Sequence, residues 1–306
     1  MKNALELTEV SKKYEKEDNY ALKSISFKVE AGDFFALLGP NGAGKSTTIG
    51  IISSIIKKTT GKVNVFDFDI DKKPEQAKLI TGVVPQEFNF NMFEEVIDIV
   101  QNQAGFYGIP AKKAKPIIEA NLKSLGLWEK RFSKARSLSG GMKRRLMIAR
   151  SLTHKPKILI LDEPTAGVDI ELRESMWQFL EKINKEEGVT IILTTHYLEE
   201  AERLCRNIAI IDQGEISEIS SMKNLLKKID LETFVLDINK DNNDIKLESC
   251  DHKFISNTEL EIHIPKDQCL NQVFQELDSK KITVTSMINK QNRLEKLFLQ
   301  RIKSKK

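Results

Sequence analysis

The segment Gly39-Pro40-Asn41-Gly42-Ala43-Gly44-Lys45-Ser46 limits the possible folds more than any other part of this chain. It matches the pattern GxxxxGK[ST], and it lies between an apolar run at 33–39 and a helix-length segment at 45–56. In that setting, glycines allow backbone N–H groups to point at phosphate oxygens, and the start of the helix favours an anion. We therefore predict a nucleotide phosphate site, with Lys45 at the β- and γ-phosphates and Ser46 as a Mg²⁺ ligand.

Further apolar runs predict an α/β fold with a parallel core sheet wrapped by helices. Buried strands are indicated after the phosphate loop, each separated from the next by helix-like segments, at 79–86, 157–164, 189–196 and 207–216. Alternating segments at 4–10, 22–30 and 62–70 are typical of half-buried strands, and the first two predict an N-terminal antiparallel β subdomain.

Two other regions differ in character from this alternating core. Residues 87–155 are rich in helical patterns and predict a helical insertion. Beyond residue 228 the pattern loosens into a small α+β unit, with strands at 232–238, 259–265 and 281–288 and helices at 267–280 and 292–302. We therefore expect a nucleotide-binding domain at 1–228 and an accessory domain at 229–306.

Composition narrows the class of protein. The 306 residues have a net charge of +4, and no apolar run approaches the roughly 18 residues that a membrane span needs. The N-terminus lacks the apolar segment of a signal peptide, so a cytoplasmic protein is expected. Cys205, Cys250 and Cys269 are scattered and predict reduced structural thiols, and His252 and His263 lack companions at metal-ligand spacing.

Two acidic residues end the apolar run at 158–161. A buried strand would deliver Asp162 and Glu163 to its carboxyl end, where open α/β sheets bind ligands. Acids in this position often cap a helix instead, and Pro164 and Thr165 follow them here. Beside a phosphate loop, we favour Asp162 as a Mg²⁺ ligand and Glu163 as the base that activates the attacking water.

Two polar residues end neighbouring strands. His196 follows the run at 190–195, and it could contact a γ-phosphate at the same sheet edge, although a lone histidine after a strand is usually structural. Gln86 ends the strand at 79–86, and spacing alone would make it an ordinary surface glutamine.

A second glycine motif lies about a hundred residues after the first. Ser139-Gly140-Gly141 precedes a helical pattern, MKRRLMIAR, and a helix start behind adjacent glycines favours an anion. The basic side chains of this helix are expected to form mostly a solvated face, with some salt bridges to the sheet.

These motifs, in this order, resemble those of the ATP-binding cassette (ABC) ATPases. Residues 39–47, ending at Thr47, match the Walker A motif, 138–142 the signature motif, 158–163 Walker B and 166–169 the D-loop. The resemblance covers roughly residues 4–225. It implies that Gln86 acts in catalysis and in Mg²⁺ binding, that His196 is the switch histidine, and that Tyr14 stacks on adenine.

The resemblance also explains the two glycine motifs. In this family two chains meet head to tail, and each ATP lies between one chain's Walker A motif and the other chain's Ser139-Gly140-Gly141 segment. It therefore implies ATP and Mg²⁺ as cofactors and a second copy of the chain as a partner.

Within the family, the segments GMKRRL, DEPTAGVD and NRLEKLFL are similar to those of the nucleotide-binding subunits of ABC-2-type exporters. That resemblance implies a membrane permease as partner, with the protein held at the inner face of the membrane. Residues 87–108 are the expected docking surface. The alternative is a soluble ABC ATPase acting on ribosomes or nucleic acid, but such proteins usually carry two cassettes or long coiled-coil arms, so no nucleic-acid partner is expected.

Overall fold

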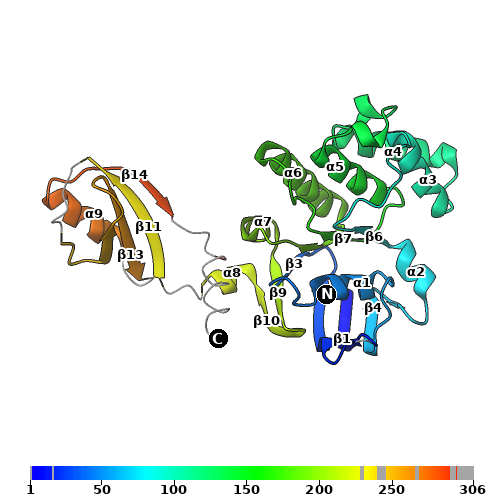
Figure 1. The fold of residues 1–306 in the computed structure, drawn as a ribbon, viewed down its shortest axis with the longest axis horizontal. Coiled ribbons are helices and arrows are strands. Elements are labelled where there is room, and N and C mark those ends of the chain that lie inside the picture. Colours follow the sequence, from blue (N-terminus) through cyan, green and yellow to red (C-terminus); the bar gives the residue numbers. More distant parts are fainter. Residues whose placement is uncertain are drawn as a thin grey trace. The chain divides into compact units, whose positions relative to one another are not determined.

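The computed structural model describes residues 2–15, 17–227, 231–239, 246–265, 269–289 and 294. The chain divides into two compact units, Met1–Ser221 and Met222–Lys306. Among the described residues, the first contains two sheets and a group of helices, and the second contains one sheet and two helices (Figure 1). Within the described residues, no helix is both long and apolar enough to cross a membrane.

The first sheet of unit 1 is the antiparallel one expected at the N-terminus. It contains β1 (Asn3–Lys13), β2 (Tyr20–Glu30), β4 (Thr60–Val65) and β5 (Phe68–Asp69), in the order β2-β1-β4-β5. Buried and exposed residues alternate along β2, because one face of this sheet packs on the core while the other meets solvent.

The second sheet carries the parallel strands and orders them β10-β9-β3-β8-β7-β6. Its strands are β3 (Phe34–Leu38), β6 (Thr81–Val84), β7 (Ile158–Asp162), β8 (Thr190–Thr194), β9 (Asn207–Asp212) and β10 (Glu215–Ser221). Every residue of β3, β7 and β8 is buried, as strands covered on both faces require.

One strand prediction was wrong. The run at 207–216 is two strands, because Gln213 and Gly214 adopt φ angles of 49° and 79° and turn the chain. The strand β10 therefore pairs antiparallel with β9 instead of extending it. The apolar pattern alone does not show this turn, and Gly214 is the one sequence signal that indicates it.

Helix α1 (Lys45–Ile52) begins directly after the phosphate loop and ends four residues earlier than the pattern at 45–56 suggested. Ile49, Ile51 and Ile52 belong to one core cluster that also contains residues of both sheets. Burying side chains of this size contributes about 1.5–3 kcal/mol each. This core fixes the start of α1 against the end of β3. Among the described residues of unit 1, the other helices outside the insertion are α2 (Pro74–Leu79), α6 (Ile170–Glu187) and α7 (Leu198–Leu204).

The helical insertion lies between β6 and β7. It contains α3 (Val96–Phe106), α4 (Ala111–Ser124), η1 (Trp128–Lys130), η2 (Ala135–Ser137) and α5 (Gly140–Ser151). Figure 1 shows α3, α4 and α5 grouped together on one side of the parallel sheet. The insertion follows β6 in the chain, so Gln86 lies in the segment that connects this strand to α3.

Unit 2 contains the helices α8 (Met222–Leu226) and α9 (Leu270–Ser279) and four antiparallel strands in the order β12-β13-β11-β14. The strands are β11 (Leu231–Ile238), β12 (Asp251–Phe254), β13 (Glu259–Pro265) and β14 (Val284–Asn289). The short polar strand β12 was not predicted. The helix expected at 292–302 lies, apart from Leu294, outside the described residues.

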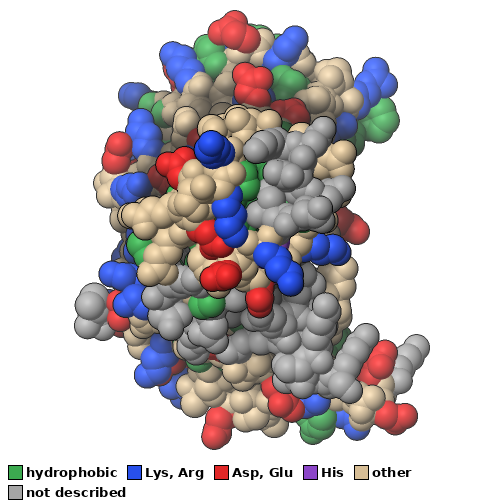
Figure 2. Space-filling view, turned by 90° about the vertical axis from the view of Figure 1, so that its left-hand side faces the viewer, with side chains coloured by type: hydrophobic (Ala, Val, Ile, Leu, Met, Phe, Trp, Pro, Cys, Tyr) green, Lys and Arg blue, Asp and Glu red, His purple; other side chains and the backbone are tan. Residues whose placement is uncertain are grey.

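The structure also places the cysteines, one of the C-terminal histidines and the surface charges. Cys205 and Cys250 are buried, whereas Cys269 is exposed, so its thiol is not a core group. His263 hydrogen-bonds Thr233 Oγ1 through Nδ1 at 3.1 Å. On the face displayed in Figure 2, lysine and arginine side chains are interspersed with aspartate and glutamate side chains.

Candidate functional site

The phosphate loop connects β3 to α1, and its glycines are required by their surroundings. A Cβ atom on Gly39 would lie 2.2 Å from the carbonyl oxygen of Ile211. Gly44 has a φ angle of 110°, and a Cβ there would lie 2.6 Å from Leu22 Cδ2. Larger residues would therefore displace the loop from β9 and β2, and the backbone N–H groups would lose their common direction.

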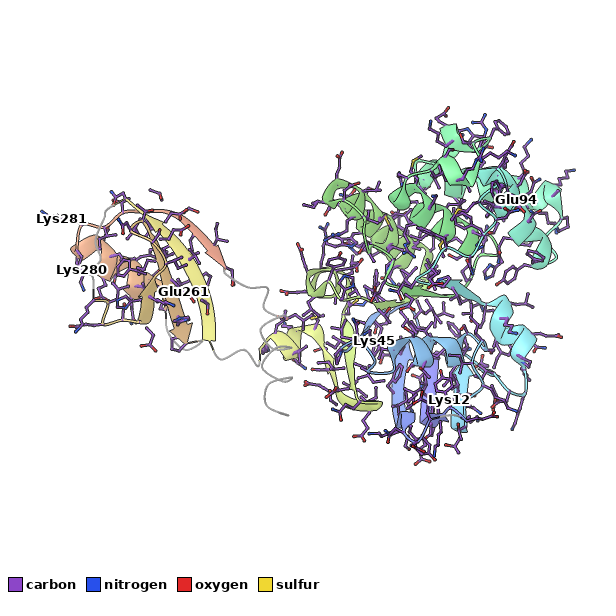
Figure 3. The ribbon with its side chains drawn as sticks, viewed as in Figure 1. Lys12, Lys45, Glu94, Glu261, Lys280 and Lys281 are labelled. Atoms are coloured by element: carbon purple, nitrogen blue, oxygen red, sulfur yellow. The ribbon has the colours of Figure 1, made fainter. Side chains whose placement is uncertain are left out.

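Lys45 lies at the end of this loop and is the first residue of α1 (Figure 3). Its Nζ donates to the carbonyl oxygens of Gly39 at 2.6 Å and Pro40 at 3.0 Å, and the residue is only 8% exposed. Burial lowers the pKa of Lys45, while Glu163 and Asp162 act in the opposite direction. The ammonium group is therefore held in the loop where an anionic phosphate would improve its poor solvation.

The buried carboxylate of Asp162 ends β7, opposite Thr194 of β8. The Thr194 hydroxyl donates to Asp162 Oδ1, and a hydrogen bond from Ser46 also reaches this carboxylate. Burial raises the pKa of Asp162. Oxygen ligands from Ser46 and Asp162 side by side suit Mg²⁺, which takes few protein ligands and completes its shell with water and phosphate oxygens.

Three of the predicted residues meet at the carboxyl edge of the sheet. Glu163 Oε2 lies 3.1 Å from Gln86 Nε2, which donates to it, and 3.3 Å from His196 Nδ1. Gln86 follows β6, Glu163 follows β7 and His196 follows β8, so three adjacent strands deliver the three side chains. Residues separated by 77 positions in the chain thereby form one polar cluster beside Lys45.

Glu163 is held in a strained backbone conformation. Its φ angle is 49°, in the left-handed region that non-glycine residues seldom adopt. Its N–H donates to the carbonyl oxygen of Thr194 at 3.0 Å, which fixes the turn. Strain of this kind persists where the surrounding structure determines the direction of a side chain.

Tyr14 lies beside the phosphate loop from the neighbouring sheet. Its hydroxyl is 3.5 Å from Thr47 Oγ1, and the side chain of Lys12 lies over its ring at 4.7 Å. Tyr14 is 38% exposed, so part of its side chain is accessible from outside.

The second glycine motif lies apart from this cluster, at the start of α5. Ser139 caps the helix by accepting from the N–H of Met142 at 3.3 Å. Gly141 is buried, and a Cβ there would lie 2.0 Å from Leu172 Cδ2. Gly140 is exposed, and a Cβ there would meet nothing within 4 Å. Packing within this chain therefore explains one of the two glycines and leaves the other unexplained.

The expectation of a solvated basic face on α5 was wrong. Arg144 is buried, and its guanidinium donates to the carbonyl oxygen of Pro85 at 3.0 Å and lies over the Phe88 ring. Arg145 donates to the carbonyl oxygen of Leu125 at 2.7 Å, and Arg150 to that of Asn89 at 3.1 Å. These arginines thus donate to backbone carbonyls of the insertion and of the segment after β6, which need hydrogen-bond partners when they are buried.

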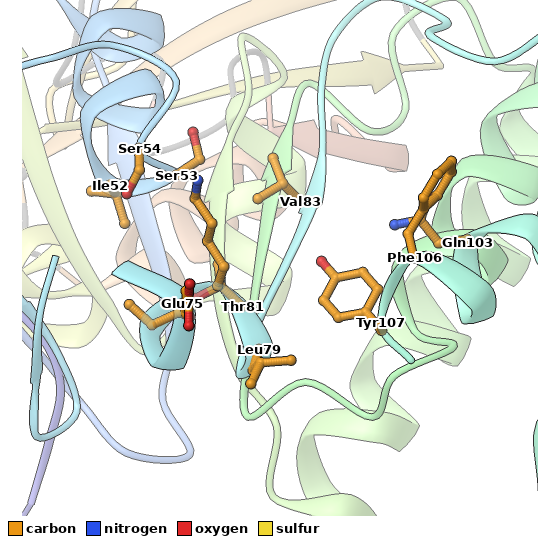
Figure 4. A pocket seen from close by; sticks show the side chains of 12 residues that line it. Ile52, Ser53, Ser54, Glu75, Leu79, Thr81, Val83, Gln103, Phe106 and Tyr107 are labelled. Carbon is orange, nitrogen blue, oxygen red and sulfur yellow. Dashed lines mark hydrogen bonds between the residues drawn. The ribbon is translucent and has the colours of Figure 1, made fainter. Parts of the chain in front are cut away.

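A cavity of about 680 Å³ lies between α1, α2, β6 and α3. Figure 4 shows Gln103, Phe106 and Tyr107 on one side, with Ile52 and the serines after α1 on the other. This cavity was not predicted, although two of its lining residues, exposed Phe106 and partly buried Tyr107, fall in the expected docking segment. Contributions from α1 and α2 depend on tertiary packing, which no local pattern indicates.

Comparison with known proteins agrees with this geometry. The model of the ABC transporter family matches residues 22–166. The linearmycin resistance ATP-binding protein LnrL of Bacillus subtilis (strain 168) is 40% identical over 214 residues, which cover 70% of this chain and 68% of that protein. The Nod factor export ATP-binding protein I of Burkholderia pseudomallei (strain 1710b) is 38% identical, covering 69% and 68%.

Solved structures show the same fold. A dimeric, post-hydrolysis ATP-binding cassette bound to ADP and Pi superposes with a TM-score of 0.66 at 28% identity. The match covers 71% of this chain and 98% of that cassette. Another dimeric structure of the same cassette gives a TM-score of 0.65 at 29% identity, covering 71% of this chain and 98% of that cassette. The predicted fold class and the family resemblance are thereby confirmed: the chain belongs to the ATP-binding proteins of the ABC transporter family and is an ATPase.

Proposed function

We propose that this chain is the ATP-hydrolysing subunit of an ABC-2-type export system and that it drives a separate membrane permease. The observation that carries the proposal is the meeting of Gln86, Glu163 and His196 beside the phosphate loop. Two relatives are named for linearmycin resistance and for Nod factor export, which supports a role in export. The protein is then held at the inner face of the cell membrane through its permease.

In this proposal, each side chain of the cluster has one task. Lys45 binds the β- and γ-phosphates, and Ser46, Asp162 and Gln86 supply oxygen ligands to Mg²⁺, which neutralises phosphate charge. Glu163 accepts a proton from the attacking water, and its contacts with Gln86 and His196 orient its carboxylate. His196 supplies a hydrogen-bond donor toward the γ-phosphate, and Tyr14 stacks on the base.

The second glycine motif acts on the ATP of another copy of the chain. Gly140 is exposed with open space around it, which suits the approach of a ligand from outside this chain. Ser139 and the N-terminus of α5 then add a hydroxyl and a helix dipole at the γ-phosphate. Two head-to-tail chains enclose two ATP molecules, and hydrolysis removes the phosphates that hold them together.

The permease docks at the cavity beside α3. Its rim carries exposed apolar side chains, including Leu79 at 53% and Phe106 at 85% exposure. The segment following Gln86 contributes Gln103, Phe106 and Tyr107 to its lining. A permease segment in this cavity would bury apolar surface and contact the chain that positions Gln86.

The test uses Glu163→Gln, which keeps the size and the hydrogen bonds of the side chain but cannot act as a base. In ATP and Mg²⁺, we expect a stable dimer of twice the 34.9 kDa monomer mass, measured by light scattering. Membranes containing this variant, solubilised in mild detergent, should yield a polytopic permease on affinity purification.

Wild-type chain in ADP is the control, because it lacks the shared γ-phosphate and should stay monomeric. A Glu163→Gln variant that remains monomeric and keeps turning over would contradict the role of Glu163 as the base. Copurification of ribosomes or nucleic acid with no membrane protein would overturn the export role.

A further inference from the structure

A buried carboxylate joins the two loops that carry Glu163 and His196. Glu200 lies in the first turn of α7 and is 0% exposed. Its Oε1 accepts from Thr165 Oγ1 at 3.0 Å and from Trp177 Nε1 at 2.8 Å. Thr195 also acts on this carboxylate, since its hydroxyl lowers the pKa of Glu200. Thr165 lies in the loop after β7, Thr195 in the loop after β8 and Trp177 in α6, so one side chain connects three separate segments.

The two threonines around Glu200 are close in sequence to the polar residues of the site. Thr165 is two residues after Glu163, and Thr195 is the residue before His196. Both threonines are buried, so neither hydroxyl has solvent as an alternative partner. The third donor, Trp177, belongs to α6 and is remote from both polar residues in sequence.

Placing the carboxylate of Glu200 in this buried environment costs desolvation free energy. Its Oε2 is buried and makes no hydrogen bond within the described part of the chain. Burial raises the pKa of Glu200, while the donors from Thr195, Trp177 and Thr165 lower it. A leucine or methionine would fill this volume without the desolvation of a carboxylate, so packing alone does not call for glutamate here.

We infer that Glu200 is a positioning residue for hydrolysis, which holds the loop after β7 and the loop after β8 in register so that His196 meets Glu163. The inference rests on the proposed role of Glu163 as the base. Glu200 does not touch the site of the γ-phosphate in this inference; it acts through Thr165 and Thr195. Its loss would let the 3.3 Å contact between His196 Nδ1 and Glu163 Oε2 lengthen.

The sharpest test removes one donor at a time. Thr165→Val keeps the shape of the side chain but deletes the hydroxyl that links Glu200 to the Glu163 loop. We expect kcat to fall roughly 10- to 100-fold, because a displacement of about 1 Å at a reacting group costs up to that factor. The KM for ATP should stay within about twofold, since Lys45 and the phosphate loop are untouched. Thr165→Ser restores the hydroxyl and should recover most of the rate.

Trp177→Phe is the matched control, because it deletes the donor from α6 and leaves both threonine links in place. It should lower the melting temperature by an amount similar to Thr165→Val but keep kcat close to that of the wild type. Glu200→Ala should resemble Thr165→Val in kcat, and Glu200→Gln should recover part of the rate by keeping an acceptor for the Thr165 hydroxyl.

The outcomes separate this inference from the proposed function. Equal loss of kcat in Trp177→Phe and Thr165→Val would show a general structural role and overturn the inference. A folded Thr165→Val protein with wild-type kcat would also overturn it. Glu163→Gln is assayed alongside: if that variant keeps turning over, the proposed base role has failed, whereas its inactivity beside an active Thr165→Val protein rejects the inference alone.

Discussion

At the scale of the residue, the site is held together by groups that satisfy one another before any nucleotide binds. Lys45 donates to two carbonyl oxygens of its own loop, and Gln86 and His196 both contact Glu163. The polar atoms are therefore already directed toward one region, and binding of ATP replaces partners without building the arrangement anew. Such pre-organisation reduces the entropy lost in reaching the reactive state.

Lys45→Ala should weaken ATP binding. The substitution removes the ammonium group and leaves the carbonyl oxygens of Gly39 and Pro40 without their donor. Loss of a charged hydrogen bond of about 1.5–3 kcal/mol corresponds to a roughly 10- to 100-fold higher Kd for ATP. Titration calorimetry with ATP measures this, and Lys57→Ala is a control because Lys57 lies beyond α1. Unchanged affinity and hydrolysis would reject the phosphate-loop assignment.

Ser139→Arg should leave ATP binding to the monomer unchanged but lower turnover, roughly 100-fold if Ser139 supplies a donor to the transition state. Ser139 is exposed, and its hydroxyl accepts from the N-terminus of α5, so we expect a long side chain there to disturb an incoming partner and not the fold. Titration calorimetry and a phosphate-release assay give the two values. Unimpaired phosphate release would refute the participation of the second glycine motif.

How far single residues can be predicted from the sequence depends on where they lie in the pattern. Gln86, Glu163 and His196 each end an apolar run, and parallel strands bring such positions to one edge. Thr194, Arg144 and Glu200 lie within strands or helices, and their partners are 32, 59 and up to 35 residues away. Their contacts depend on packing between elements, so neither spacing nor residue type reveals them.

At the scale of the element, α5 connects the second glycine motif to the segment that carries Gln86. Ser139 caps the helix, and Arg144, one turn later, donates to the carbonyl oxygen of Pro85, the residue before Gln86. A displacement of α5 therefore acts on Gln86 through one buried hydrogen bond. The helix was predicted from the sequence, but the direction of its arginines was predicted wrongly, because a charged helical pattern usually faces solvent.

Arg144→Met should release the segment around Gln86. The carbonyl oxygen of Pro85 loses its donor, at a cost of about 1–3 kcal/mol of unfolding free energy, and kcat should fall about tenfold as Gln86 shifts from Glu163. Arg145→Met is the matched control, because that neighbouring arginine donates to Leu125 within the helical insertion. Urea unfolding and steady-state ATP hydrolysis measure both variants. Equal loss of kcat in the two would argue against a specific connection to Gln86.

At the scale of the whole molecule, two units with separate cores share one chain. Unit 2 has its own apolar cluster, including Leu236, Leu260 and Ile262, and it contains none of the nucleotide-site residues. Its sheet strands β11 and β13 were predicted because alternation there is strong, whereas β12 was missed because DHKF lacks apolar alternation. The turn at 213–214 was missed because the strand-like pattern of β9 was read as continuing through it into residues 215 and 216.

The stability of unit 2 should depend on acid pH through Glu276. Its carboxylate accepts from the N–H groups of Glu248 and Ser249, from the Ser249 hydroxyl and from Lys280, and its pKa is lowered from 4.5 to about 2. A lowered folded-state pKa stabilises the fold above the unfolded value, and that contribution is lost as pH falls from about 4.5 toward 2.

Glu276→Gln removes the titrating group and should flatten this dependence while lowering stability at neutral pH by about 1.5–3 kcal/mol. Hydrogen exchange of the segment 246–250, corrected for intrinsic rates, reports the unit within the full chain between pH 6 and pH 3. Asp278→Asn, on the same helix, is the control. A variant whose pH dependence equals that of the wild type would reject the assignment to Glu276.

The open space around Gly140 has a consequence for genetics. If each ATP is enclosed by one chain's phosphate loop and the other chain's Ser139-Gly140-Gly141 segment, then defects in the two motifs belong to different composite sites. A Lys45→Ala chain paired with a Ser139→Arg chain places both lesions in one site and leaves the other intact. Two alleles that are each inactive alone would then complement one another in a cell that expresses both.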